Sequence, residues 1–418
     1  MRTQYSGRGG RAIAWLTGVV AVIGVVACSN FDRLLAVETP SRLGEASFLT
    51  PSNAALISAS AVADYECALG AYAVVSGLGA GEFVDAIQTA ARWNYDRRNV
   101  VATDALYSTS GCEGIGVYTP INTARYTNDQ AVKMIEGWTD AQVPNRQRLI
   151  ALNAALAGYS LVLLGEGFCE GTINVGPSQT PAQLFDSAEA RFTKAIAAAT
   201  TANEQSVLNL ALVGRARARI NRGLTAGAAE DAARVPAGFV YNATADANAG
   251  RRNNRVFQQN NQAFSVTVAP SYRNLNDPRV VVTDINRLAA DQVNRVWTQG
   301  KYASLTASFP IATYVEAQLI LAEARGAATG LGILNALRAR AGVGLPPLPA
   351  TSDFTAALVE ERRRELFVQG NRWYDVRRFN LPLNPASGTQ YPKGGVYGDQ
   401  RCWPLPDAER LANPNFSS

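Results

Sequence analysis

The sequence predicts a mostly helical α/α fold with one loop-rich face. Over much of the 418-residue chain, apolar residues recur at the three- and four-residue spacing that places them on one side of a helix. Small residues recur where such helices would cross, and two long stretches lack a helical pattern. These observations indicate helices packed on helices, with the irregular stretches left to form a ligand-binding face.

Each element of this scaffold follows from local signals. Thr180 suits the N-cap of one helix, and Pro181 suits its first turn. Small residues such as Gly158 and Gly214 resemble those at the crossings of tetratricopeptide-type hairpins, although the repeat is too degenerate to define a period. The predicted helices cover residues 58–78, 146–164, 180–196, 204–222, 225–234, 314–326, 332–341 and 353–370.

The first residues predict export with a lipid anchor. Arg2, Arg8 and Arg11 precede an apolar run over 12–27, which ends directly before Cys28. A positive start, a short apolar run and a small residue before a cysteine are typical of a lipoprotein signal peptide. We therefore expect residues 1–27 to be removed and Cys28 to be acylated. A plain N-terminal anchor helix with an incidental cysteine is the alternative.

The remaining chain is expected to form a single domain over 28–418. Removing 27 residues from 418 leaves 391, which is enough for one large domain or two small ones. We expect a helical scaffold over about 58–235 and 311–379. The loop-rich segments are expected over about 81–118 and 238–301.

Composition excludes several classes of function. Without the three arginines of the leader, 36 basic residues face 34 acidic ones, a formal charge of +2. Dense Lys/Arg tracts with interleaved aromatics are missing, so we expect no nucleic-acid partner. The chain also has no histidine, which removes Ser-His and Cys-His triads and His-ligated zinc sites. We therefore expect a binding protein without a metal or other cofactor, and not an enzyme.

Four cysteines remain after Cys28, and an exported chain with an even number of cysteines favours two disulfides. Antiparallel packing of the first two predicted helices would bring Cys67 to Cys169, which leaves Cys112 for Cys402. Four free buried thiols are the alternative.

The stretch 361–379 carries the most specific motif, ERRRELFVQGNRWYDVRRF. It resembles the C-terminal signature of the SusD/RagB family, roughly E-R-R-x-E-L-x-x-E-G-x-R-W-x-D-L-x-R-W. Gln369 stands where the family has an acid, Phe379 replaces the last aromatic, and Thr313 replaces an arginine of an earlier family element. Further stretches that resemble family elements, in the same order, are 188–196, 301–302 with 310–317, 321–324, 334–342 and 404–414.

The resemblance implies a tetratricopeptide-like scaffold and a role in nutrient uptake. Proteins of this family are lipid-anchored in the outer membrane and face the outside. They capture an oligosaccharide, or in some cases a peptide, and pass it to a SusC-like TonB-dependent transporter. A different class of function, a helical-repeat lipoprotein that binds only proteins during envelope assembly, remains an alternative.

The charged half of the signature has a structural interpretation. Glu360 and Arg364, Glu361 and Arg364, and Arg362 and Glu365 are spaced to pair along one helix. Glu361 and Glu365 could instead form the acid pair of a glycosidase. We reject that alternative because the surrounding arginines would keep both carboxylates ionised, whereas a general acid needs a raised pKa.

Ligand contacts are expected from the irregular segments. Trp93, Tyr95 and Tyr107 lie beside Arg92 and Asn94, and aromatic faces next to such donors suit sugar rings. If the segment is extended, Trp93 and Tyr95 lie on one face and form a stacking platform. The alternative is that each ring anchors the local core. The segment 238–301, which contains Trp297, is the second candidate.

Overall fold

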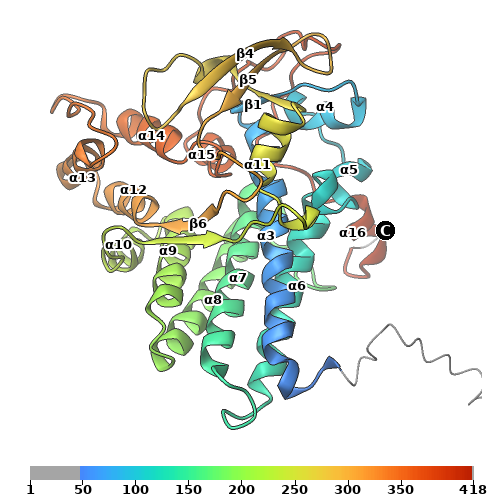
Figure 1. Cartoon of the computed structure of the whole chain (residues 1–418), viewed down its shortest axis with the longest axis vertical. Coiled ribbons are helices and arrows are strands. Elements are labelled where there is room, and N and C mark those ends of the chain that lie inside the picture. The colour runs from blue at the N-terminus through green and yellow to red at the C-terminus, as the bar shows by residue number, and fades with distance from the viewer. Residues whose placement is uncertain (1–47, 417–418) are drawn as a thin grey trace, which may run out of the picture. The chain divides into compact units, whose positions relative to one another are not determined.

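Helices dominate the fold, as the sequence predicts (Figure 1). The computed structural model describes residues 48–416. The scaffold helices are α3 (Ala54–Gly79), α6 (Tyr118–Glu136), α7 (Arg146–Gly167), α8 (Pro181–Thr201), α9 (Gln205–Asn221), α10 (Thr225–Ala233), α12 (Tyr314–Arg325), α13 (Ala327–Ala339), α14 (Phe354–Glu365) and α15 (Arg372–Arg378). Figure 1 shows α3 and α6 to α9 running side by side. The sequence analysis assigned no helix to 118–136, where the structure has α6.

Helix α7 forms the centre of the core. Every residue of α7 from Leu149 onward is buried. Among the described residues α7 is the one helix long and apolar enough to cross a membrane, but its apolar window lies wholly inside the protein. Gly158 on α7 and Gly214 on α9 both lie against the ring of Phe192 on α8, where a Cβ atom would clash. The predicted small residues at helix crossings are thus confirmed at these two positions.

The start of α8 follows its predicted local signals. The Thr180 side chain accepts a hydrogen bond from the backbone N–H of Gln183, whose side chain in turn accepts from the N–H of Thr180. This capping box satisfies two backbone donors that the helix itself leaves free. Pro181 occupies the first helical turn.

Short elements fill the two segments that were expected to be loop-rich. Three antiparallel pairs form two-stranded sheets: β1 with β3, β2 with β6, and β4 with β5. Their bounds are β1 (Phe83–Asp85), β2 (Val240–Ala243), β3 (Val266–Val268), β4 (Val282–Leu288), β5 (Arg295–Gln299) and β6 (Phe309–Thr313). The short helices are α4 (Ala90–Arg97), α5 (Ala105–Ser108), α11 (Arg255–Phe257) and α16 (Asp407–Ala412). In Figure 1, β1, β4, β5 and α4 gather at one end of the helical layer.

The predicted disulfide pairing is wrong. The structure joins Cys67 to Cys112 and Cys169 to Cys402. Cys67 lies on the side of α3 that packs against the turn holding Cys112. Cys169 follows the end of α7, where its backbone N–H donates to the carbonyl of Trp403 at 2.9 Å. A turn packed on α3 therefore selects the partner of Cys67, and long-range packing of a late segment selects the partner of Cys169.

Candidate functional site

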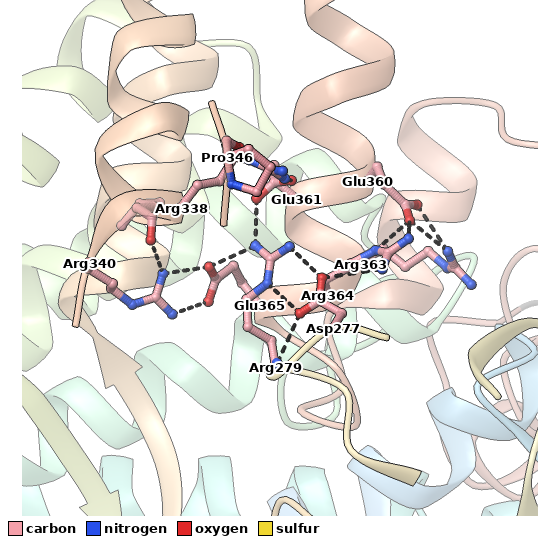
Figure 2. Close-up of polar contacts among 11 residues, drawn as sticks. Asp277, Arg279, Arg338, Arg340, Pro346, Glu360, Glu361, Arg363, Arg364 and Glu365 are labelled. Atoms are coloured by element: carbon pink, nitrogen blue, oxygen red, sulfur yellow. Dashed lines mark hydrogen bonds and ion pairs between the residues drawn. The ribbon is translucent and has the colours of Figure 1, made fainter. Parts of the chain in front are cut away.

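The charged part of the signature forms an ion-pair network around two buried carboxylates (Figure 2). Arg279 reaches Glu361 at 2.5 Å and Glu365 at 3.0 Å. Arg338 also binds Glu361 at 2.6 Å, and Arg340 binds Glu365 at 2.6 Å. Each carboxylate is thus bound by two guanidinium groups. This arrangement joins α13, α14 and the segment before β4, and it does not suit a general acid.

The pairs predicted within the signature helix are confirmed only in part. Glu360 pairs with Arg364 at 2.5 Å, as expected, and also with Arg363 at 2.9 Å. The expected pairs of Glu361 with Arg364 and of Arg362 with Glu365 are replaced by partners from other elements. Arg362, for example, binds Asp375 of α15 at 2.9 Å. The signature therefore braces neighbouring elements against each other more than it braces its own helix.

Two of the predicted ligand-binding aromatics belong to the core. Trp93 and Tyr95 lie in helix α4 and not in an extended segment, so they form no platform of alternating rings, and Tyr107 lies in α5. Tyr95 is 2% exposed and its hydroxyl donates to the carbonyl of Ile115. Tyr107 is 1% exposed and stacks on Phe168. Both rings point into the protein, so neither can stack on a ligand, and the alternative interpretation as core anchors holds for them.

The polar neighbours of these rings hold α4 in place. Arg92 forms an ion pair with buried Asp85 of β1 at 3.2 Å. The Asn94 side chain donates to Asp104 at 2.8 Å. Because both side chains are engaged with the protein, neither presents the free donor that the sequence analysis expected.

Trp93 is half-buried and touches a segment that the sequence analysis did not consider. Its indole N–H donates to the carbonyl of Ile87 at 3.0 Å. The ring lies 6.3 Å from that of Tyr391, and the ammonium of Lys393 lies 5.3 Å from its centroid. Trp93 therefore helps to fix the late loop 384–397 beside α4.

This late loop, residues 384–397, is anchored by a buried lysine. The ammonium of Lys393 pairs with Asp85 at 2.7 Å and with Asp291 at 3.4 Å. Asp96 lies beside this pair, where it accepts hydrogen bonds from the N–H of Asp85 and the hydroxyl of Tyr391. Burial raises the pKa of Asp96 to about 7. The loop is thus held against β1 and α4 by a compact polar cluster.

Two adjoining pockets lie beside this loop, the first between the loop, β1 and β5, and the second between the end of α3, α14 and α15. The first, which we call the β5 pocket, has a volume of about 300 Å³, and the second, the α15 pocket, about 240 Å³. They share Gly81, Ser271 and Asn384, and we call them together the β1 groove. The β5 pocket is lined by Gly81, Phe83, Val84, Asp96, Ala269, Pro270, Ser271, Arg273, Val293, Asn294, Arg295, Asn384, Pro385, Thr389, Gln390, Pro392 and Tyr397. The α15 pocket is lined by Gly79, Ala80, Gly81, Ser271, Tyr272, Glu360, Arg363, Arg372, Val376, Pro382, Leu383 and Asn384.

The lining of the β1 groove combines apolar walls with hydrogen-bonding groups. Prolines and β1 side chains supply the apolar part. The Gln390 amide and guanidinium groups such as Arg273 supply donors, whereas the Asn294 amide donates to Asp85 and Asp291. Small-molecule sites are typically concave, largely apolar and fitted with a few placed polar groups. The part of the chain that the structure describes holds no cluster of acids and cysteines suited to a metal ion.

The sequence analysis located this site only in part. Its second candidate, 238–301, contributes Arg273, Asn294 and Arg295, whereas Trp297 lies under the Arg273 guanidinium at 5.0 Å from the ring centroid. The loop 384–397 was missed. A usable signal was the pair of tyrosines in QYPKGGVYG, which surround a Gly-Gly turn beyond the signature.

Comparison with models of protein families shows to which family the chain belongs. The model of the SusD family matches residues 171–415, which is more than half of the chain. The chain belongs to the SusD family. The matched range includes the signature and the loop 384–397, whereas the candidates of α4 lie outside it.

Solved structures of the SusD superfamily share the fold. A SusD superfamily protein from Bacteroides vulgatus matches with a TM-score of 0.64 and 16% identity over 87% of this chain and 97% of its own. A laminarin-binding SusD-like protein matches with a TM-score of 0.64 and 16% identity, over 86% of this chain and 97% of its own. Surface glycan-binding protein A from Bacteroides fluxus matches with a TM-score of 0.64 and 15% identity, over 85% of this chain and 96% of its own. No curated protein matches the chain by sequence. At these identities the structures establish the SusD fold, including its tetratricopeptide-like scaffold.

Proposed function

We propose that this SusD-family protein binds a glycan in the β1 groove and delivers it to a SusC-like TonB-dependent transporter. The observation that carries the proposal is the groove itself, in which amide and guanidinium donors surround apolar walls on the loop-rich face. Sugar rings are apolar on one face and carry hydroxyl groups at the edge, so they fit such a lining. Two proteins of the same fold are named for the glycans they bind.

The proposed role is capture without catalysis. The two signature carboxylates that could have formed an acid pair are occupied by arginines. The proposed location is the outside of the outer membrane, through a lipid on Cys28, which lies outside the described residues. Replacing Cys28 with Ser should release the protein or leave it as an unprocessed precursor. Membrane retention at mature size without a lipid label would contradict the anchor.

Binding by the mature domain tests the proposal directly. A glycan array and a peptide array, followed by calorimetry, separate the two ligand classes. The variant Gln390→Ala should weaken glycan binding, because it removes an exposed amide from the groove wall. Gln205→Ala, an exposed amide at the start of α9, is the matched control and should bind normally. Binding of peptides alone, or of neither class, would contradict the proposal.

Delivery to the transporter needs a separate experiment. Purification of the lipidated protein from its native outer membranes should bring down a TonB-dependent transporter in a stable ratio. If envelope-assembly proteins co-purified instead, and both arrays were negative, the protein-scaffold alternative would replace the proposal.

A further inference from the structure

Two arginines of the β1 groove have no carboxylate partner. Arg273 donates through Nε to the carbonyl of Val268 at 2.9 Å and lies over Trp297. Within residues 48–416 no carboxylate lies within ion-pair distance of its guanidinium. Arg372, the first residue of α15, also has no ion pair in this range, and its buried Nη1 has no hydrogen-bond partner. One such arginine lines each pocket of the groove.

This contrasts with the other two arginines of the groove. Arg295 is bound by Asp284 at 2.7 Å. Arg363 is bound by Glu360, as Figure 2 shows. These two cations are neutralised by neighbours on the protein. Two of the four arginines that line the groove are therefore paired with carboxylates, and the other two, Arg273 and Arg372, are not.

The acids around the groove do not compensate for the two free cations. Glu360, a lining acid of the α15 pocket, already binds two arginines of α14. Asp96, a lining acid of the β5 pocket, is buried, and its pKa is raised to about 7. Glu82 faces Arg372 beyond ion-pair distance, and burial raises its pKa to about 7 as well. The groove therefore has an excess of positive charge.

We propose that the natural ligand carries acidic groups, carboxylates or sulfates, which bind Arg372 in the α15 pocket and Arg273 in the β5 pocket of the β1 groove. The inference rests on the proposed glycan-binding function and specifies the class of glycan. A guanidinium group binds carboxylate or sulfate oxygens through two parallel N–H donors, which a neutral hydroxyl cannot match. A buried unpaired charge is costly, and an anionic ligand group would relieve that cost.

Matched acidic and neutral glycans test the inference. Polygalacturonate and alginate represent carboxylates, and chondroitin sulfate and heparin represent sulfates. Carboxyl-reduced or desulfated forms of the same polymers are the neutral counterparts. The mature domain should bind an acidic polymer at least tenfold more tightly than its counterpart, a difference of about 1.4 kcal/mol. The preference should weaken as NaCl is added, because salt screens the attraction.

Two variants locate the acidic group. Arg273→Gln and Arg372→Gln should each lower affinity for the acidic polymer at least tenfold and leave affinity for the neutral form unchanged. Arg251→Gln is the control, since this arginine is exposed and paired with Asp64 outside the groove. Melting curves identify any loss of folding in the Arg372 variant, whose Nη1 atom is buried. Both arginines are half-buried as whole residues, and the Arg273 variant keeps the test intact if Arg372→Gln does not fold.

The possible failures are distinguishable. Equal or tighter binding of the neutral forms, or binding of neutral glycans alone, would overturn the acidic ligand but support glycan capture. Acidic binding that survives both substitutions would also overturn it, because the acid group would then lie elsewhere. If no glycan of either kind bound, the proposed function would fail together with this inference.

Discussion

The two disulfides should stabilise the protein by different amounts because they close loops of different length. Cys67 and Cys112 are separated by 45 positions, whereas Cys169 and Cys402 are separated by 233. In the chain-entropy model a crosslink lowers the entropy of the unfolded chain by about 2.1 + 1.5R ln n cal/mol/K for a loop of n residues. At 25 °C this gives about 4 kcal/mol for the shorter loop and about 5.5 kcal/mol for the longer one.

Double variants allow each crosslink to be measured alone. In Cys67→Ala/Cys112→Ala only the longer loop can be opened by dithiothreitol, and in Cys169→Ala/Cys402→Ala only the shorter one. Comparing oxidised and reduced forms of the same variant cancels the effect of the substitutions themselves. The free energy of unfolding from urea titrations should fall by about 1.5 kcal/mol more on reduction in the first variant than in the second.

Thermal unfolding gives an independent readout. With an unfolding entropy of about 2.1 cal/mol/K per residue, losses of this size lower the Tm by roughly 5 to 7 °C in a domain of this length. Equal losses in the two variants would refute the loop-length reasoning. Non-reducing peptide mapping that joined Cys67 to Cys169 would refute the connectivity on which it rests.

Three further predictions follow from buried groups. Arg217 binds Glu166 at 2.5 Å and Glu316 at 3.3 Å. Arg217→Ala leaves both acids without their partner, so the free energy of unfolding in a urea titration should fall by about 3–5 kcal/mol. A loss below about 1 kcal/mol would show that water reaches both acids. Tyr95→Ala should lower the free energy of unfolding by about 3–5 kcal/mol, because it empties a buried site. An unchanged Tm together with weakened ligand binding would instead show that Tyr95 contacts the ligand. Burial raises the pKa of Glu82 from 4.5 to about 7. Between pH 4.5 and pH 7 the folded protein therefore holds a proton on Glu82 that the unfolded chain releases, and the free energy of unfolding falls as the pH rises through this range. Glu82→Gln should therefore add on the order of 3 kcal/mol at pH 8 and little at pH 4, and an equal gain at both pH values would contradict the shifted pKa.

Helices were predictable because their determinants are local. Apolar periodicity and the Thr180-Pro181 start both act within a few residues, and the structure confirms them at α8. The helix α6 was missed although Ile121, Ala124, Ala131 and Ile135 recur at helical spacing, because polar residues outnumber these apolar ones in the segment. The signature likewise predicted the family, but its charge spacing predicted only the pair of Glu360 with Arg364, because Glu361 and Arg362 find their partners in other elements.

The candidate site was predictable only as a region. The segment 238–301 was correctly singled out as poor in helix, and it supplies Arg273, Asn294 and Arg295. The sequence did not show that Tyr95 and Tyr107 point inward. An aromatic ring beside polar residues looks the same in a core and in a binding loop, and only the packing around it separates the two.

By itself, the sequence determined the helical scaffold, the family and the positions of the cysteines. The tertiary structure decided which cysteines pair and which segments build the groove. Lys393 and Asp85, for instance, are separated by 308 positions and lie 2.7 Å apart. Contacts of this kind depend on how whole elements pack, because the free energy of burying their faces selects the partners, and no local spacing records that choice.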